Sequence, residues 1–147
     1  MIPKNENYDD GQDDGGELDF ILETEPSLTY AMKVNPDETK DSIFVGRVDD
    51  TEAVRQAVMK ILNTERYENE IYSWDYGIEL QDLFGMSMAY VMSEIKLRIE
   101  DALLADDRIA SVGGFEVERT GKRTIHCSFT VTTVQGEEIE EETEIDI

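Results

Sequence analysis

The stretch SMAYVMSEIKLRIEDALL, residues 87–104, decides the fold class of this chain. Its apolar side chains recur three or four residues apart, which places them on one face of a helix of roughly four to five turns. Charged side chains occupy the opposite face, and the Ser87 hydroxyl can accept a hydrogen bond from the first helical turn. The apolar face holds Met88, Val91, Met92, Ile95, Ile99, Ala102 and Leu103. The stretch therefore predicts a long amphipathic helix that begins after Ser87.

The chain before this helix predicts a β-hairpin and a shorter helix. Residues 28–34 alternate between apolar and polar side chains, residues 35–42 are rich in turn formers, and residues 43–48 resume a strand pattern. Asp49, with Glu52 three residues further on, has the spacing of a capping box. An apolar stripe then predicts a helix over residues 51–63.

Three strand-like runs follow the long helix. They cover residues 109–118, residues 125–134 and the C-terminal segment 137–147. In residues 125–134, apolar and polar side chains alternate, so one face of the strand is expected to be buried and the other wet. The turn at residues 119–122 contains Gly121, which is free to take a positive φ. The predicted class is α+β: an N-terminal β-hairpin, two main helices and a C-terminal antiparallel sheet.

The negative charge of the chain is concentrated at its two ends. The 147 residues carry a formal net charge of −22, yet residues 28–136 hold 19 acids against 12 bases, which is ordinary. This distribution divides the chain into an acidic, largely disordered arm (1–27), one domain (28–136) and an acidic C-terminal strand or arm (137–147). A chain this acidic is a poor binder of nucleic acid or anionic membranes, because both need a cationic surface.

The C-terminal segment allows two interpretations. Residues 144–147 alternate at the period of a strand, and the surrounding acids would protect such a strand from indiscriminate edge pairing. Alternatively, residues 137–147 are a frayed, solvated end of the chain.

The residues that usually carry chemistry are few. His126 is the only histidine and Cys127 the only cysteine, and as neighbours on a strand they point to opposite faces. They therefore cannot form a nucleophilic pair, and they cannot supply a transition-metal site of the ordinary type. We expect neither catalysis nor a cofactor. The one weak alternative is a glycosidase that uses acids near Trp74 and Tyr76, namely Glu70, Asp75, Glu79 or Asp82.

Two stretches in the middle of the chain are more specific. The run AVMKILNTERYE, residues 57–68, is followed by YSWDYGIELQDLFG, residues 72–85. Together they resemble the contractile-tail sheath initiator or baseplate wedge family, most closely its branch in PBSX-type prophages and bacteriocins. In that family a helix precedes an aromatic–aspartate–tyrosine–glycine motif, and a long helix and a short antiparallel sheet follow. The resemblance spans residues 28–135, and residues 72–85 are its most specific part.

The resemblance implies a structural protein of a phage tail or phage-tail-like particle. Such a protein is made in the bacterial cytoplasm and then built into the baseplate. Its implied partners are sheath subunits and baseplate wedge proteins, with tube or hub proteins as a further option, and neither nucleic acid nor membrane. Family members also carry a lysozyme-like label, so peptidoglycan cleavage by Glu79 or a nearby acid stays as the alternative. A small acidic adaptor that binds a basic partner through its tails is a third interpretation.

The family also has a Glu-Pro-Arg motif after the long helix, which is implicated in gripping the helical core bundle of the wedge. The matching residues here are Asp106, Asp107 and Arg108. Asp107 replaces the proline, so the local backbone is less fixed. Arg108 can equally cap the carbonyls at the end of the helix, and both roles remain open.

The resemblance also points to surfaces for partners. Trp74 and Tyr76 either pack beneath a loop or anchor an interface with wedge proteins. Sheath subunits of these machines join their neighbours by donating terminal strands, so the predicted C-terminal sheet is expected to accept one. We therefore predict partner contacts at Ile139, Ile145 and Ile147. On this view, deleting residues 137–147 leaves a folded protein that no longer supports sheath assembly.

Overall fold

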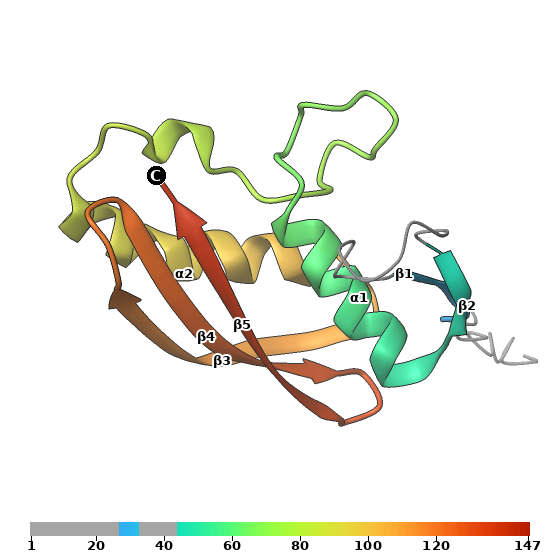
Figure 1. The fold of residues 1–147 in the computed structure, drawn as a ribbon. Coiled ribbons are helices and arrows are strands. Elements are labelled where there is room, and N and C mark those ends of the chain that lie inside the picture. Colours follow the sequence, from blue (N-terminus) through green and yellow to red (C-terminus); the bar gives the residue numbers. More distant parts are fainter. Residues whose placement is uncertain (1–26, 33–43) are drawn as a thin grey trace, which may run out of the picture.

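The computed structural model describes residues 27–32 and 44–147 (Figure 1). The predicted acidic arm, apart from Ser27, and the predicted turn at residues 35–42 therefore lie outside the described residues. No helix in the described part of the chain has the length and apolar character needed to cross a membrane.

The described elements form an α+β fold with two separate antiparallel sheets. The order along the chain is β1 (Thr29–Met32), β2 (Phe44–Val48), α1 (Asp50–Leu62), the short 3-10 helix η2 (Gln81–Leu83), α2 (Met88–Leu104), β3 (Ile109–Arg119), β4 (Thr124–Thr133) and β5 (Glu138–Asp146). Strands β1 and β2 pair with each other, and the second sheet has the order β3-β4-β5. The predicted hairpin, two main helices and C-terminal antiparallel sheet are confirmed.

Both helices begin at the N-cap residues that the sequence indicates, although the helix bond described for the Asp49 side chain goes to Asp50 and not to Glu52, as a capping box requires. The Asp49 side chain accepts a hydrogen bond from the N–H of Asp50 at 2.8 Å, at the start of α1. The Ser87 hydroxyl accepts from the N–H of Tyr90 at 3.4 Å, at the start of α2. Each cap satisfies a backbone donor that a helix leaves without an internal partner.

The core lies between the helices and one face of the three-stranded sheet (Figure 1). The alternation of β4 is confirmed, because its odd-numbered side chains from Ile125 to Thr133 are buried and its even-numbered ones are only partly covered. The predicted apolar face of α2 meets them with its central residues fully buried. The largest fully buried side chains are Val58, Ile78, Leu83, Val91, Ile95, Ile99, Leu103, Ile125, Cys127, Val131 and Ile139.

The turn between β3 and β4 forms where expected, without the positive φ that Gly121 is free to take. The N–H groups of Thr120 and Gly121 both donate to the carbonyl of Thr124, at 3.2 Å. Gly121 does not take a positive φ. The glycine that does so in the C-terminal sheet's other turn is Gly136, with a φ of 87°, between β4 and β5.

The C-terminal segment is a strand of the domain's own sheet. Residues 138–146 form β5, which pairs with β4 along its whole length. Ile139, Ile145 and Ile147 are 1%, 7% and 6% exposed and belong to the core. The expectation that residues 137–147 can be removed from a folded protein is therefore wrong, because the deletion takes three buried side chains and a third of the sheet with it.

Candidate functional site

The outer edge of β5 is the candidate docking site. The β4–β5 ladder runs without a bulge from Thr124 opposite Asp146 to Thr132 opposite Glu138. Strand β5 has β4 on one side, and within residues 27–32 and 44–147 no strand pairs with its other side. A regular edge of this kind presents unpaired backbone groups to a further strand.

The ladder also shows which backbone groups face outward. The carbonyl of Glu137 accepts from the N–H of Thr133 at 2.8 Å, and the N–H of Ile147 donates to Arg123 at 2.9 Å. Hydrogen-bonded and non-hydrogen-bonded pairs alternate in an antiparallel ladder. The odd-numbered residues of β5 therefore bond to β4, and the even-numbered ones turn their N–H and C=O groups toward the open edge.

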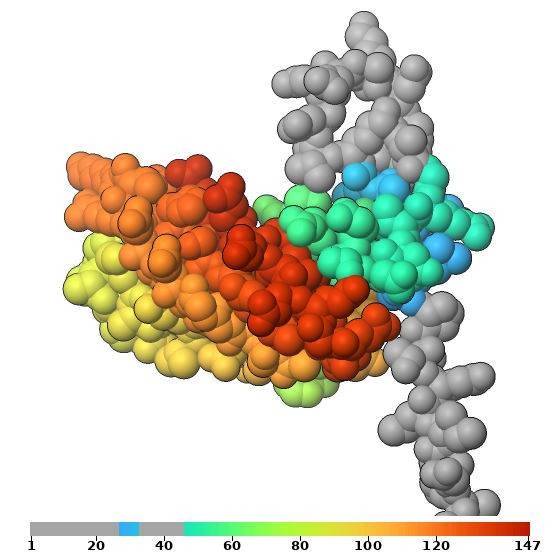
Figure 2. Space-filling model, turned by 90° about the horizontal axis from the view of Figure 1, so that it is seen from below, coloured from blue at the N-terminus to red at the C-terminus, as the bar shows by residue number. Residues whose placement is uncertain are grey.

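The even-numbered residues also build an acidic row on the outer face of the sheet. They are Glu138, Glu140, Glu142, Glu144 and Asp146, and all five are exposed. Figure 2 shows the C-terminal strands, coloured orange to red, at the surface of the molecule. The facing residues of β4 are four hydroxyl side chains and His126, whose Nε2 lies 3.5 Å from Oε2 of Glu142. The alternation of acids in the sequence is the signal for this row, and it is the same pattern that predicts a strand protected from indiscriminate edge pairing.

A groove runs beside this edge, between α1 and β5. It is lined by Arg55, Val58, Met59, Leu62 and Asn63 from α1 and by residues 141–144 of β5. Inside it, Nη1 of Arg55 lies 3.3 Å from Oε1 of Glu141. Burial raises the pKa of Glu141, and the positive charge of Arg55 only partly offsets this effect. The groove thus combines apolar side chains with an ion pair whose carboxylate is partly buried.

The three isoleucines that were predicted to contact partners are not exposed in this groove. Ile139, Ile145 and Ile147 pack into the protein's own core. Whatever binds the edge of β5 consequently meets its backbone and its acidic side chains, while the isoleucines hold the strand in place.

Asp106 and Arg108 form a closed pair at the start of β3. Nε of Arg108 lies 2.9 Å from Oδ1 of Asp106, Nη2 lies 2.6 Å from Oδ2, and the N–H of Arg108 donates to Oδ1 at 3.1 Å. Burial of the Asp106 carboxyl opposes its ionisation, but the hydrogen bonds from Arg108 outweigh burial and lower its pKa. The described hydrogen bonds of the Arg108 side chain go to Asp106 and not to carbonyls of α2, so the capping role is not observed.

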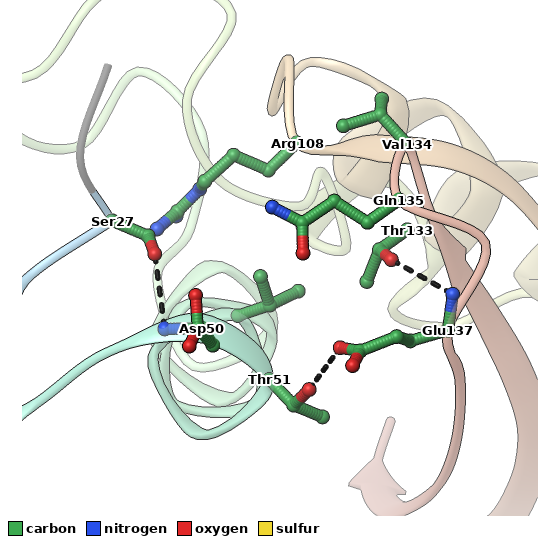
Figure 3. Close-up of a pocket in the computed structure, with 9 residues that line it drawn as sticks. Ser27, Asp50, Thr51, Arg108, Thr133, Val134, Gln135 and Glu137 are labelled. Atoms are coloured by element: carbon green, nitrogen blue, oxygen red, sulfur yellow. Dashed lines mark hydrogen bonds between the residues drawn. The ribbon is translucent and has the colours of Figure 1, made fainter. Parts of the chain in front are cut away.

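The Arg108 side chain also lines a small pocket (Figure 3). The pocket lies between the start of α1 and the β4–β5 turn, and Gln135 points into it from the turn. The Thr51 hydroxyl donates to the Glu137 carboxylate across its floor, and the N–H of Glu137 donates to the Thr133 hydroxyl at 3.1 Å. These bonds tie α1 to the sheet beside the edge strand.

Trp74 and Tyr76 occupy different environments in the loop between α1 and η2. Trp74 is 77% exposed, so packing beneath a loop does not describe it. Tyr76 is half-buried against the core and stacks on Tyr72 with ring centroids 4.5 Å apart. Burial is the main cause that raises the pKa of Tyr76.

The residues considered for catalysis are buried in the core or form ion pairs on the surface. Cys127 is buried while His126 lies on the opposite face, and burial raises the pKa of Cys127 to about 11. Glu79 and Asp82 both pair with Arg98, at 3.5 Å and 2.5 Å. In the part of the chain that the structure describes, no three His, Cys, Asp or Glu side chains are placed to hold a metal ion.

Comparison with known proteins decides the family. The model of the contractile injection system sheath initiator family matches residues 29–136. The chain belongs to the contractile injection system sheath initiator family. It is also 41% identical over 125 residues to the phage-like element PBSX protein XkdS of Bacillus subtilis (strain 168), and the match covers 82% of this chain and 84% of that protein. The resemblance carried by residues 57–68 and 72–85 is confirmed.

This sheath initiator is thus a structural component of a phage-like contractile particle. The matched range contains α1, the aromatic loop, α2 and most of the C-terminal sheet, but it ends before β5 begins at Glu138. XkdS is a protein of the phage-like element PBSX, which lies in the branch of the family that the sequence resemblance indicates.

Proposed function

We propose that this sheath initiator is the platform on which the sheath polymerises, and that it offers the outer edge of β5 to an extended strand of the first sheath subunit. The observation that supports this most directly is the unbroken β4–β5 ladder, whose far side carries no strand in the described residues. Its function is binding, without turnover of a substrate.

The added strand would gain affinity from main-chain hydrogen bonds. The outward N–H and C=O groups of the even-numbered residues of β5 are spaced about 7 Å apart, which is the repeat of two residues in a strand. Side chains of the added strand that point inward would enter the groove beside α1 and cover Met59 and Leu62. This is strand addition, in which the backbone gives affinity and the alternate pockets give specificity.

Charge defines the chemistry of the partner strand. On its outward side the partner lies next to the acidic row of β5, so lysine or arginine at every second position is favoured. The same row opposes pairing of β5 with β5 of a second copy, because like charges would face each other. The acidic row therefore favours a basic partner strand and disfavours pairing with β5 of a second copy.

The remaining proposed partners follow from the same particle. We propose that wedge proteins contact the initiator through Trp74 and through the surface around Asp106 and Arg108, and that the protein is assembled in the bacterial cytoplasm before it becomes part of the baseplate. Tube or hub proteins are further neighbours. Asp106 and Arg108 are already paired with each other, so their proposed role is to fix the shape of this corner.

A proline in the edge strand tests the proposal. Glu142 is even-numbered and exposed, so Glu142→Pro removes an outward N–H without removing a bond to β4. Glu142→Thr is the matched control, since it loses the same charge but keeps the N–H. Both variants are introduced into a strain that lacks the native protein, and particles are counted by electron microscopy.

The two variants should differ in whether their particles carry a sheath. We expect folded protein from both, sheathed particles with Glu142→Thr, and bare tubes with Glu142→Pro. Normal sheaths with folded Glu142→Pro would contradict strand addition at this edge. If Glu142→Pro does not fold, Glu140→Pro and Glu144→Pro test the same groups at neighbouring outward positions.

A further inference from the structure

The loop of residues 66–77, between α1 and η2, has a closed neck. The N–H of Arg66 donates to the carbonyl of Ile78 at 2.9 Å, and the N–H of Ile78 donates to Thr64 at 2.9 Å. The Glu65 carboxylate accepts from the N–H groups of Leu80 and Gln81, at 2.9 Å and 3.0 Å. The two ends of the loop are therefore held together by backbone and side-chain bonds.

Arg66 fastens this neck to the body of the protein. Its Nε donates to the carbonyl of Gly77 at 3.0 Å, and its Nη1 lies 2.8 Å from Oδ2 of Asp101 on α2. The Arg66 side chain is only 11% exposed. A partly buried arginine that bridges three segments fixes the loop relative to α2.

The interior of the loop is ordered as well. Tyr72 and Tyr76 stack, and the N–H groups of the same two residues close turns onto Asn69 and Ser73 at 3.2 Å and 3.1 Å. Gly77 has a φ of +98°, and a Cβ there would lie 2.6 Å from the carbonyl oxygen of Thr64. Only glycine fits this close approach without moving the backbone, so Gly77 allows the neck of the loop to close.

This fixed loop projects from the body of the molecule (Figure 1) and carries the most exposed large apolar side chains in the described residues. Ile71 is 87% exposed, Trp74 is 77% exposed and Tyr67 is 65% exposed. An ordered loop that keeps such side chains in water is preorganised for binding, because its conformational entropy is already lost before a partner arrives. Tryptophan and tyrosine also dominate binding energy at protein interfaces.

We propose that residues 67–74 form a second docking surface, which inserts Ile71 and Trp74 into an apolar pocket with a basic rim on another protein of the particle. The charge of the loop identifies the rim: Glu68 and Glu70 are exposed beside the apolar side chains, while Arg66 is engaged by Asp101. A second copy of this acidic chain or an anionic lipid surface would be repelled at short range.

The inference deepens the proposed contact through Trp74 and rests on the proposed function in taking the partner from the same particle. The loop anchors the initiator, and the edge of β5 receives the sheath. The two surfaces therefore fail differently. A defective loop leaves the initiator out of the particle, whereas a defective edge leaves it in a particle that lacks a sheath.

The first test measures incorporation. Ile71→Gln and Trp74→Gln are combined, and Leu97→Gln on α2 is the control because Leu97 is 60% exposed but lies outside the loop. Purified particles from complemented deletion strains are probed for the initiator by immunoblot. We expect the loop variant to fold, with an unchanged melting temperature, and to be depleted roughly tenfold or more, because tryptophan anchors of this type carry much of the binding energy at interfaces and about 1.4 kcal/mol already corresponds to tenfold. Incorporation equal to that of Leu97→Gln would overturn the proposal.

The second test identifies the occupant. A photo-crosslinking amino acid replaces Trp74, assembled particles are irradiated, and the linked peptides are sequenced. A lysine- or arginine-rich peptide of another particle protein other than the sheath subunit is the expected result. A link to this chain itself, to a sheath subunit or to no protein would overturn the proposal. So would Trp74-dependent binding of the free protein to vesicles of phosphatidylglycerol, which would make the loop a membrane anchor.

Discussion

Arg108 holds the carboxylate of Asp106 by two parallel hydrogen bonds, from Nε to Oδ1 at 2.9 Å and from Nη2 to Oδ2 at 2.6 Å. The pair closes the turn through which the chain passes from α2 into β3, and the carbonyl of Asp106 accepts from the N–H of Ile109 at 3.0 Å in the same turn. Bidentate geometry makes this a specific contact, and the partial burial of both side chains shields it from salt.

Asp106→Asn should destabilise the protein by about 2 kcal/mol, because it replaces a charge-assisted pair by a neutral contact. The folded pKa of Asp106 is lowered, so its stabilisation is present above the unfolded value of 3.8 and is lost as the pH falls through the folded pKa. Urea unfolding at pH 7 and pH 3 measures both effects. Asp107→Asn, at the exposed neighbouring residue, is the control and should change stability by less than about 0.5 kcal/mol.

Glu141→Gln should have the opposite effect near neutral pH. Burial raises the folded pKa of Glu141 above 4.5, so its ionised form costs stability at pH values above the folded pKa. The variant should therefore be more stable than the native protein at pH 7, and the difference should shrink as the pH falls through the folded pKa and should vanish below the unfolded value of 4.5. Thermal melts across this range measure it, with Glu140→Gln on the exposed face as the control. A variant that is less stable at pH 7 would show that the Arg55 contact outweighs burial.

Neutralising the acidic row should expose the edge of β5 to self-pairing. We expect the combined change of Glu138, Glu140, Glu142 and Glu144 to glutamine to keep the fold, because all four side chains are exposed. Without their mutual repulsion, two β5 strands can pair, and a concentration-dependent dimer should appear in sedimentation. The native protein at equal concentrations should not form this species. If the variant sediments like the native protein, the acidic row does not protect the edge of β5 from self-pairing.

Cys127 should resist alkylation until the core opens. Its side chain is fully buried between the sheet and the helices, and burial raises its pKa to about 11 despite the nearby charge of Lys96. Iodoacetamide at pH 8 should leave the native protein unlabelled for hours and label it completely in denaturant. Rapid labelling of the native protein would contradict the described packing of β4.

Elements with a regular period could be predicted from the sequence. The stripe from Met88 to Leu103 and the alternation from Ile125 to Thr133 each decide both the type of element and its buried face. The conformation of the loop at residues 66–77 depends instead on contacts of Glu65 and Arg66 with residues more than ten positions away. No local pattern encodes such contacts, and for that reason the exposure of Trp74 was not decided from the sequence.

The burial of the C-terminal isoleucines could not be predicted from the sequence for a different reason. Its isoleucines stand among seven acids in residues 137–147, so composition alone suggested a solvated arm. The strand period of two places the isoleucines and the outer carboxylates on opposite faces, since the isoleucines fall on odd positions and the outer carboxylates on even ones. Burial of Ile139, Ile145 and Ile147 became evident only with the register of β5 against β4, a tertiary relationship.

A reconstruction of the assembled baseplate at a resolution that traces strands tests the central claim most directly. The account predicts a fourth strand beside β5, supplied by a sheath subunit, with its backbone bonded to residues 138, 140, 142, 144 and 146 and with basic side chains above the acidic row. An edge of β5 that is open to solvent in the mature particle, or one that is covered by another part of this same chain, would contradict it.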